Sequence, residues 1–433
     1  MERGLIEIAG MARTRLGRRR IGMSLCQATY PLLRGLASVH RRLSARRARF
    51  VAVVGSFGKT TTARAVNAAL GRPEDPEVEH NSFYNVPWNV LRTRLDPGPH
   101  VIEVGICDWG QMEEYAGIVR PDAVVVTAVG SEHGTTFGTL EATRSEKVKM
   151  VEAVRPGGHV VLNGDDPNVR WMASRAAAPV TTFGLQPDND VRADDVRLDW
   201  PHGTAFTLHA NGGSHRARIR LLGQPGLYAA LAGVALARAE GVSVVRSLGR
   251  LRSFEPTRRR LNPIRLPSGA WVIDDTFKGG EETQYVALAL LGHIPARRRT
   301  AVLGEVTEPQ GSRGDLYRGI GEEAGRVADL IVSLARSKVH RLIRVGAERS
   351  GMERSRVVRA RNPREAVEAL PADLGPGDVV LLKGRGTQHL ERVAIALQGR
   401  TVRCQIRPCK VKRGGCWTCP MLERGWDGLP RPD

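Results

Sequence analysis

The sequence contains no uninterrupted apolar run of about 18 residues, the length that a membrane-spanning helix requires. It also lacks a cleavable signal peptide, because arginines interrupt every apolar run near the N-terminus. These two absences predict a cytoplasmic protein without a transmembrane segment. No internal repeat is present. A chain of 433 residues with 41% hydrophobic content is nevertheless long enough to form two or three domain cores.

Cysteine is scarce, with six residues in the whole chain. Cys26 and Cys107 are isolated, and we expect them to be buried thiols. The other four form a C-x₄-C-x₆-C-x₂-C array near the C-terminus: Cys404, Cys409, Cys416 and Cys419. Four thiolates at this spacing suit a tetrahedral structural Zn²⁺ site. An iron–sulfur cluster or redox-active cysteine pairs are the alternatives.

Acidic residues are nearly absent from the first fifty positions, which contain twelve arginines but only two acidic residues, Glu2 and Glu7. This segment carries a formal charge of +10, half of the +20 of the whole chain. A basic arm of this kind favours nucleic acid, anionic lipid or an acidic substrate as a partner, although it is also typical of a solvated segment. Apolar residues alternate with the arginines at roughly helical spacing. That pattern fits a helix on a membrane surface or a helix packed on the protein body.

The stretch "VAVVGSFGKTTTARAVNAAL", residues 51–70, predicts a buried strand, a glycine turn and a helix. It lacks the first glycine of the usual G-x-x-x-x-G-K-[ST] phosphate loop, since Val53 stands there. The remaining order is a shorter G-x-x-G-K-T-T form. Backbone N–H groups at a helix N-terminus bind anions, a lysine adds charge, and a threonine hydroxyl suits Mg²⁺. The expected nucleotide-binding residues are Gly55, Gly58, Lys59, Thr60 and Thr61.

Short apolar runs alternate with helical patterns from residue 50 to about 170, which predicts a doubly wound parallel sheet. Residues 180–220 alternate like a small antiparallel appendage, and a second α/β region follows with four expected strands. The sequence therefore predicts a basic arm (1–48), a central ATP-binding domain (49–245), a C-terminal α/β domain (246–400) and a four-cysteine tail (401–433).

Glu103 and His133 follow two apolar runs of the first region, "VIEVGI" and "AVVVTAVG". The carboxyl ends of parallel strands meet at one edge of a sheet, so both residues are expected near the phosphate loop. A carboxylate and an imidazole at that edge suit Mg²⁺ ions shared with nucleotide phosphates.

Several motifs, in their order along the chain, resemble those of the Mur ligase family, the ATP-dependent enzymes that add amino acids or dipeptides to peptidoglycan precursors. They include "GSFGKTTT", "HNSFYNVPWNVL", "IEVGICDWG", "SEHGTTFG", "FEPTRRRLN", "VIDDTFKGGEET" and "VLLKGRGTQHLE". The motifs are most similar to those of the members that add D-alanyl-D-alanine to a UDP-muramoyl tripeptide. The resemblance implies a Mur-ligase-like central P-loop ATPase domain with a parallel sheet and a Rossmann-like C-terminal α/β domain that closes over the nucleotide.

The resemblance also implies roles for particular residues. It assigns Mg²⁺ to Thr60, Glu103, His133 and a carbamylated Lys147. Nucleotide contacts in the last domain fall on Arg260 and Asp274. Substrate contacts fall on Asn81, Lys278 and Lys383. Lys59, His133 and Lys147 are the expected catalytic residues.

Three departures from the family pattern bear on the substrates. The fifty residues before the phosphate loop are too few for the family's UDP-sugar domain. "GQPGLYAALA" offers Pro225, Gly226 and Ala229 in place of the histidine and asparagines of the linker helix, which bears on the contact with adenine. "DDTFKGG" carries Lys278 and Gly280 in place of asparagines, which bears on the incoming substrate. We therefore expect an ATP-dependent ligase that joins an acid to an amine through an acyl phosphate, on a substrate other than the UDP-muramoyl tripeptide.

Three alternatives remain. The first is a peptidoglycan-precursor ligase whose sugar-binding domain is supplied by a partner. The second is a polyglutamate-type ligase. The third is a nucleic-acid-binding or scaffold protein with a degenerate ATPase. Salt-dependent affinity for nucleic acid would favour the last alternative over catalysis.

Overall fold

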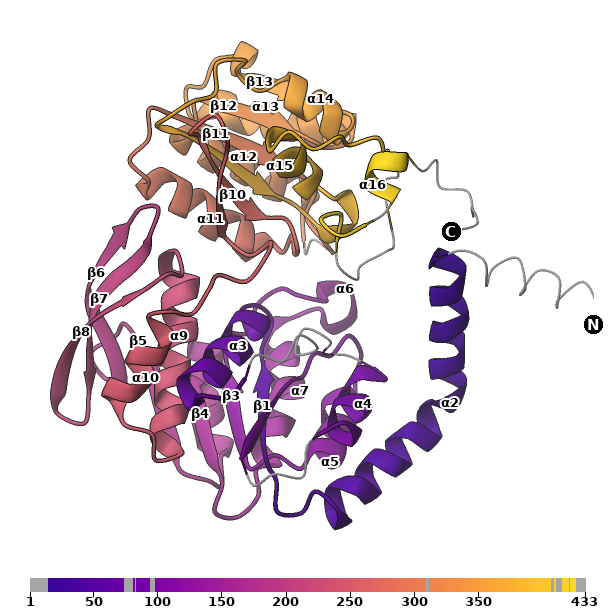
Figure 1. Ribbon diagram of the computed structural model, residues 1–433, viewed down its shortest axis with the longest axis vertical. Coiled ribbons are helices and arrows are strands. Elements are labelled where there is room, and N and C mark those ends of the chain that lie inside the picture. Colours follow the sequence, from indigo (N-terminus) through magenta and orange to yellow (C-terminus); the bar gives the residue numbers. More distant parts are fainter. Residues whose placement is uncertain are drawn as a thin grey trace, which may run out of the picture. The chain divides into compact units, whose positions relative to one another are not determined.

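The computed structural model divides the chain into two compact units (Figure 1). It describes residues 15–73, 81, 83–93, 98–308, 311–405, 409, 415–419 and 421–425, and among residues 15–27 it describes only the side chain of Leu25. The central unit is Tyr30–Thr257, and the other unit, called the C-terminal unit below, comprises Arg258–Asp433 and is grouped with Met1–Thr29. Within the described residues, no helix is both long and apolar enough to cross a membrane.

The central unit is built on an eight-stranded sheet with the order β2-β1-β3-β4-β5-β6-β7-β8. Neighbouring strands from β2 to β6 pair in parallel. The last two pairings, β6 with β7 and β7 with β8, are antiparallel. The strands are β1 (Arg49–Val54), β2 (Pro99–Glu103), β3 (Ala123–Val126), β4 (His159–Asn163), β5 (Val180–Gly184), β6 (Val191–Asp199), β7 (Gly203–Ala210) and β8 (Gly213–Ile219). The doubly wound sheet and the antiparallel appendage predicted from the sequence are confirmed.

Side chains of β1 alternate between the two faces of the sheet, as a strand buried on both sides requires. Val51 and Val53 pack in one core with α3 (Lys59–Leu70) and α9 (Gly223–Ala239). Phe50, Ala52 and Val54 pack in the other core. The helices around that second core are α4 (Asn85–Leu91), α5 (Gln111–Val119), α7 (Leu140–Glu152) and the end of α2 (Arg15–Leu43). The start of α3 is thereby fixed against the end of β1.

The remaining short elements of the central unit complete these layers. They are α6 (Gly134–Phe137), α8 (Pro167–Arg170), a 3₁₀ helix at Trp171–Arg175 and α10 (Val244–Leu251). Because α10 packs on α3 and α9, the central unit continues past residue 245 to Thr257.

The basic N-terminal segment is a helix whose second half belongs to the central unit. Residues 1–14 of the predicted arm lie outside the described residues. Arg41 of α2 is buried, and its guanidinium donates to the carbonyl oxygens of Val119 and Arg120 and to Asp122. A buried arginine with this many acceptors belongs to the core rather than to a solvated arm.

The C-terminal unit has a six-stranded sheet with the order β13-β12-β11-β14-β10-β9, parallel except for β9 at its edge. The four predicted strands correspond to β10 (Trp271–Asp275), β11 (Arg298–Leu303), β12 (Leu330–Ser333) and β14 (Asp378–Lys383). The edge strands β9 (Asn262–Arg265) and β13 (Val357–Arg359) were not anticipated. The predicted fold class, two α/β domains, is confirmed.

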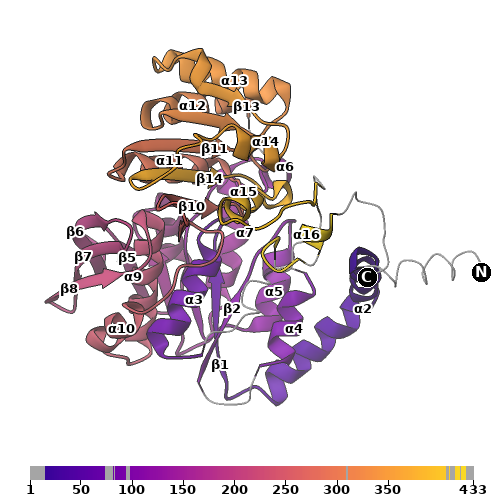
Figure 2. The same cartoon turned by 45° about the horizontal axis from the view of Figure 1, so that its top comes forward.

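Helices cover both faces of this second sheet (Figure 2). One face packs with α14 (Pro363–Glu368) and α15 (Glu391–Leu397) in a single core. The other carries α11 (Glu281–His293), α12 (Arg313–Val327) and α13 (Ser337–Arg349). Short 3₁₀ helices at Arg354–Arg356 and Gly386–Gln388 and the helix α16 (Met421–Arg424) complete the described elements.

Candidate active site

The turn between β1 and α3 has the backbone that the phosphate-loop motif predicts. Gly55 has φ +145° and Gly58 has φ +81°, a region that favours glycine. A Cβ on Gly55 would lie 2.0 Å from Thr127 Oγ1. The loop therefore depends on glycine at this position both for its conformation and for its close approach to β3. It presents the N-terminus of α3 at the carboxyl edge of the sheet, where anions bind.

Lys59 folds back over this loop. Its Nζ donates to the carbonyl oxygens of Gly55 at 2.7 Å and Ser56 at 3.0 Å. It also lies 3.2 Å from the carboxylate of Glu132. Oxygen partners of this kind offset the cost of burying the ammonium group inside the loop. Sequence reasoning missed Glu132, although it directly precedes the singled-out His133.

Thr60 and Glu103 form a buried oxygen pair beside the loop. Thr60 Oγ1 donates to Glu103 Oε2 at 2.6 Å. The other carboxylate oxygen accepts from the side chain of Asn81. Glu103 reaches this position because β2 pairs with β1 so that Glu103 lies opposite Val53. Hydroxyl and carboxylate oxygens are the ligands that Mg²⁺ prefers, so this donor set fits the ion.

Lys147 and His133 lie in the same region. Lys147 of α7 is buried, and its Nζ donates at 3.2 Å to the Gly55 carbonyl oxygen, which also accepts from Lys59. His133, at φ +59°, precedes α6, and its Nε2 is 3.8 Å from Glu132 Oε1. The structure thus brings residues from β1, β2, α3, α7 and the β3–α6 connection around one loop. The hydroxyl of Thr61 donates to Thr257 Oγ1 at 3.3 Å, so a phosphate contact of this residue would come from its backbone N–H in the first turn of α3.

In the C-terminal unit, Asp274 lies at the end of β10 in a buried polar chain. Thr276 Oγ1 donates to Asp274 Oδ1 at 2.6 Å, and Arg259 Nε donates to Thr276 Oγ1 at 3.0 Å. Among the described residues, Asp274 Oδ2 has no hydrogen-bond partner. Burial raises the pKa of Asp274 to about 7. Sequence reasoning singled out Arg260, whose guanidinium lies 4.4 Å from the centroid of the Phe277 ring, and missed its buried neighbour Arg259.

Lys383 ends β14 and is held at the same edge of that sheet. Its Nζ lies 2.6 Å from Asp275 Oδ2 and donates to the Lys278 carbonyl oxygen at 3.0 Å. The parallel register places Lys383 directly opposite Asp275. The structure therefore brings together Lys278 and Lys383, which are more than a hundred residues apart in sequence.

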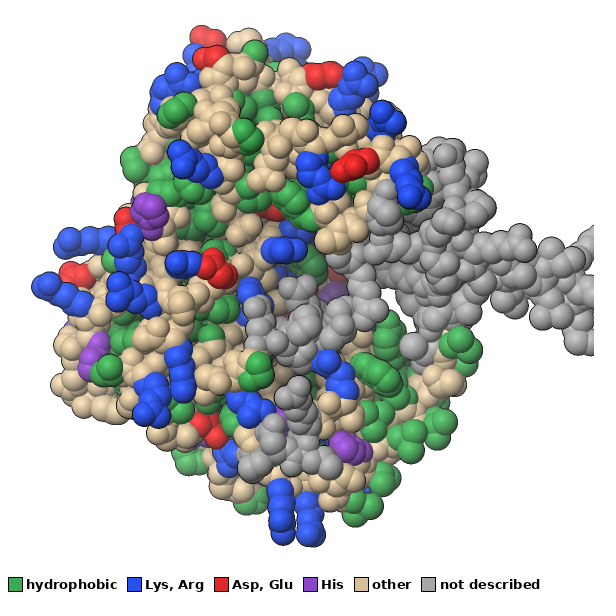
Figure 3. Space-filling view, in the orientation of Figure 1, with side chains coloured by type: hydrophobic (Ala, Val, Ile, Leu, Met, Phe, Trp, Pro, Cys, Tyr) green, Lys and Arg blue, Asp and Glu red, His purple; other side chains and the backbone are tan. Residues whose placement is uncertain are grey.

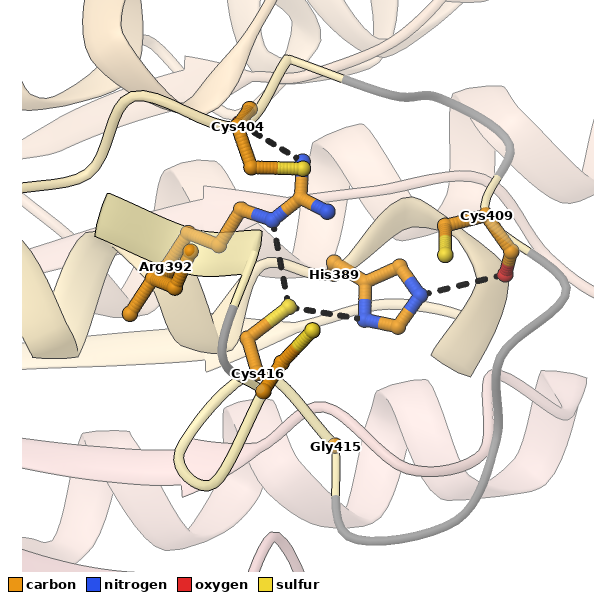
Figure 4. Close-up of a pocket in the computed structure, with 8 residues that line it drawn as sticks. His389, Arg392, Cys404, Cys409, Gly415 and Cys416 are labelled. Atoms are coloured by element: carbon orange, nitrogen blue, oxygen red, sulfur yellow. Dashed lines mark hydrogen bonds between the residues drawn. The ribbon is translucent and has the colours of Figure 1, made fainter. Parts of the chain in front are cut away.

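The four tail cysteines converge on one small cavity of the C-terminal unit, together with His389 and Arg392 (Figure 4). Cys107 belongs to the central unit and is exposed. The expectation of a buried Cys107 is therefore wrong, because the residue lies in the loop after β2 and not in a strand. The side chain of Cys26 lies outside the described residues.

Comparisons with known protein families match both units. Residues 53–237 match the Mur ligase middle domain, and residues 259–386 match the Mur ligase glutamate ligase domain. The UDP-N-acetylmuramoyl-tripeptide–D-alanyl-D-alanine ligase of Mycobacterium bovis is 32% identical over 391 residues, which cover 83% of this chain and 74% of that protein. The ligase of the same name from Bacillus subtilis is 26% identical, over 80% of this chain and 75% of that protein.

Solved structures share the fold. MurF from Acinetobacter baumannii superposes with a TM-score of 0.75 at 22% identity, covering 86% of this chain and 81% of that one. MurF ligase from Thermotoga maritima in complex with ADP gives a TM-score of 0.74 at 22% identity, covering 86% and 84%.

Proposed function

Because the chain belongs to the Mur ligase family, we propose that it is an ATP-dependent ligase that joins a carboxylate to an amine through an acyl phosphate. The family membership expected from the order of the motifs is confirmed. The observation that carries the proposed activity is the convergence of Lys59 and Lys147 on the carbonyl oxygen of Gly55. A degenerate ATPase would have no reason to keep both lysines buried at the loop.

The proposed reaction has two steps. One oxygen of the substrate carboxylate attacks the γ-phosphorus of ATP, the bond to the bridging oxygen breaks, and ADP leaves. The amine then attacks the carbonyl carbon of the acyl phosphate, inorganic phosphate leaves, and the nitrogen loses a proton to give the amide. In such a reaction the protein mostly orients crowded anions and offsets their charge. Lys59 supplies that positive charge from inside the phosphate loop.

We assign Mg²⁺ binding to Thr60, Glu103, His133 and Lys147. The ion would neutralise and orient phosphate oxygens. The buried Thr60–Glu103 oxygen pair fits this role directly. The contribution of Lys147 requires its conversion to a carbamate, which replaces an ammonium by a carboxylate-like group. The other assignments are Gly55, Gly58 and Thr61 for the phosphates, Arg260 and Asp274 for the nucleotide, and Asn81, Lys278 and Lys383 for the substrates.

We further propose that the acid substrate differs from a UDP-muramoyl tripeptide. Where the family carries asparagines, the segment after β10 has Lys278 and Gly280, which supports a changed substrate. The names of the relatives favour the other candidate, the cell-wall ligase that uses D-alanyl-D-alanine.

The exposed side of α2 is the part of the arm that supports an anionic partner. Its exposed apolar side chains are three to seven residues apart and form one stripe: Leu25, Leu32, Leu36, Val39 and Leu43. Figure 3 shows hydrophobic side chains gathered along this helix. Arg34, Arg42 and Arg46 are exposed in the same segment. An apolar stripe with flanking arginines suits the surface of an anionic membrane, and we assign that partner to α2.

The test is ADP release by the purified full chain with Mg²⁺ and paired acids and amines. UDP-muramoyl tripeptide with D-alanyl-D-alanine is the reference pair, and a panel of smaller acids with amino acids is the second arm. Amide formation with any pair supports the ligase. Efficient turnover of the reference pair would refute the proposal of a different acid substrate and establish the cell-wall role. If no pair gives acid-dependent ADP release, the proposed ligase activity is refuted.

A further inference from the structure

The four-cysteine tail folds onto the end of the last α/β sheet and encloses a cavity of about 10 Å³. That volume is close to the space that a single water molecule or metal ion needs. Cys404, Cys409 and Cys416 are buried, and Cys419 is half-buried. The N–H of Cys419 donates to the Cys416 carbonyl oxygen at 3.3 Å, so the C-x-x-C pair lies on one turn. Four sulfur ligands therefore line one small enclosure, although they are separated by up to fifteen positions in sequence.

Two cationic or hydrogen-bonding side chains from the sheet domain meet these cysteines (Figure 4). Arg392 Nε donates to Cys416 Sγ at 3.1 Å, and Arg392 Nη1 donates to the Cys404 carbonyl oxygen at 3.1 Å. His389 Nε2 lies 3.1 Å from the Cys409 carbonyl oxygen, and its Nδ1 lies 3.3 Å from Cys416 Sγ. A buried guanidinium beside sulfur offsets the negative charge that a set of thiolates brings into the interior.

His389 is the other side chain at this cavity that could bind a metal ion. His389, Glu391 and Cys416 offer ligand atoms that all lie within 4.8 Å of one another, which no other trio of such residues does within the part of the chain that the structure describes. Both nitrogens of His389 already have partners, since Nδ1 is 2.8 Å from Glu391 Oε1 and Nε2 meets the Cys409 carbonyl oxygen. A histidine that binds a metal uses one ring nitrogen for the ion while the other donates a hydrogen bond, so His389 would have to give up one of these partners to bind an ion. The four cysteines, all of them among the described residues, line the same cavity and supply the remaining ligand atoms, although no three of their sulfur atoms are as close together as this trio, so a tetrahedral site requires them to draw together around the ion.

We propose that Cys404, Cys409, Cys416 and Cys419 bind one structural zinc ion, which fastens the tail to the C-terminal unit and holds Arg259 in place. Four thiolates give zinc a closed tetrahedral shell without an open position for a reacting molecule. The role is therefore structural. Nothing in the ligase reaction requires these residues, so the site is additional to the proposed active site.

The link to Arg259 passes through Glu391, which is fully buried. Glu391 Oε1 accepts from the Cys416 N–H at 3.2 Å, and Glu391 Oε2 lies 3.2 Å from Arg259 Nη2. Gly415, at φ +57°, lies so close that a Cβ there would be 3.3 Å from Arg259 Nη1. Arg259 in turn donates to Thr276, the neighbour of Asp274. Loss of the metal is thus expected to loosen the polar chain at the end of β10.

The first test measures metal in the purified full chain, without substrate, by elemental analysis. We expect one zinc ion per chain. Cys416→Ser/Cys419→Ser should lose it, while Cys107→Ser, which changes an exposed cysteine of the other unit, should retain it. Iron with acid-labile sulfide would overturn the proposal in favour of a cluster. Metal-free protein whose tail cysteines are oxidised to disulfides or remain reactive thiols would overturn it as well.

A second measurement keeps the proposal testable if the double variant fails to fold. Wild-type protein in which Co²⁺ replaces zinc should show the visible absorption of a tetrahedral four-thiolate centre. A spectrum of an octahedral ion bound by oxygen and nitrogen would contradict the ligand set. His389→Gln should leave the four-thiolate spectrum in place. A three-thiolate, one-nitrogen spectrum of the wild type that is altered in His389→Gln would assign His389 as a ligand and refute the proposed set.

The effect on Arg259 rests on the proposed function and is measured separately. Gly415→Ala leaves all four cysteines in place but presses a methyl group on Arg259. We expect unchanged zinc content with a raised KM for ATP. Unchanged zinc and unchanged kinetics would refute the link to Arg259 and leave the metal site intact. If wild-type protein shows no ligase activity, only the proposed function fails, because zinc content does not depend on it.

Discussion

Lys59→Met removes one charge from the phosphate loop while nearly keeping the length and volume of the side chain. In the structure, Nζ contacts two loop carbonyl oxygens and Glu132. The variant leaves the glycines and the backbone N–H groups unchanged. It therefore tests the charge of Lys59 apart from the shape of the loop.

The expected loss of activity is large, and the expected loss of stability is smaller. Removing one preorganised donor from developing negative charge costs about 10²- to 10³-fold in rate, or about 3–4 kcal/mol. The free energy of unfolding should fall by about 1–3 kcal/mol, because buried loop carbonyl oxygens lose a donor, whereas Glu132 is partly exposed and can be solvated. The variant should remain folded.

The assay is ADP release at saturating ATP and Mg²⁺, with a thermal melt of each protein. Lys149→Met is the matched control, because Lys149 lies on α7, two residues from Lys147, and pairs with Glu146 at 2.7 Å. The control should keep wild-type rates. Wild-type ADP formation by Lys59→Met would refute the phosphate-loop assignment, and an equal loss in both variants would point to an indirect effect of charge or folding.

The other predictions concern the metal, the helix α2 and pH. Lys147→Ala should slow ADP release, short-chain carboxylates should partly restore it, and a rate independent of bicarbonate in the wild type would exclude the carbamate. Leu32→Asp/Leu36→Asp should abolish cosedimentation with phosphatidylglycerol vesicles without lowering ADP release, and equal binding by both proteins would remove the membrane assignment. Burial raises the pKa of Asp274 from 3.8 to about 7, so the folded state binds the proton more tightly and stability should fall as pH rises between these values. Urea unfolding at about pH 5 and about pH 8 should show a smaller fall for Asp274→Asn than for the wild type.

The sequence was sufficient for the sheets because their strands are continuous apolar runs that end in recognisable turns. The strands β1 and β3 are apolar at successive positions, a pattern that predicts burial on both faces, and the cores on each side of the sheet confirm it. The edge strands β9 and β13 escaped prediction, since they have three or four residues and little apolar periodicity.

The candidate site was predictable where a motif lies at a strand end, as for Glu103 and Lys383. It was not predictable where a contact joins polar residues far apart in sequence. Arg259 and Glu391 form an ion pair across 132 positions, and no local pattern distinguishes them from surface charges. Arg41 shows the same limit, because a count of arginines cannot separate a buried side chain with backbone acceptors from a solvated one.

These long-range contacts make the cysteine tail an integral part of the C-terminal unit. Ile395 of α15 packs with Cys416 and Leu422 in a small apolar cluster. Arg392 directs its guanidinium at the tail, and Glu391 accepts from the Cys416 N–H. A chain ending at residue 400 would uncover that cluster and remove hydrogen-bond partners from two buried charged groups, which is costly unless water replaces them. The unit is therefore defined by these contacts and not by the extent of the family match, which ends at residue 386.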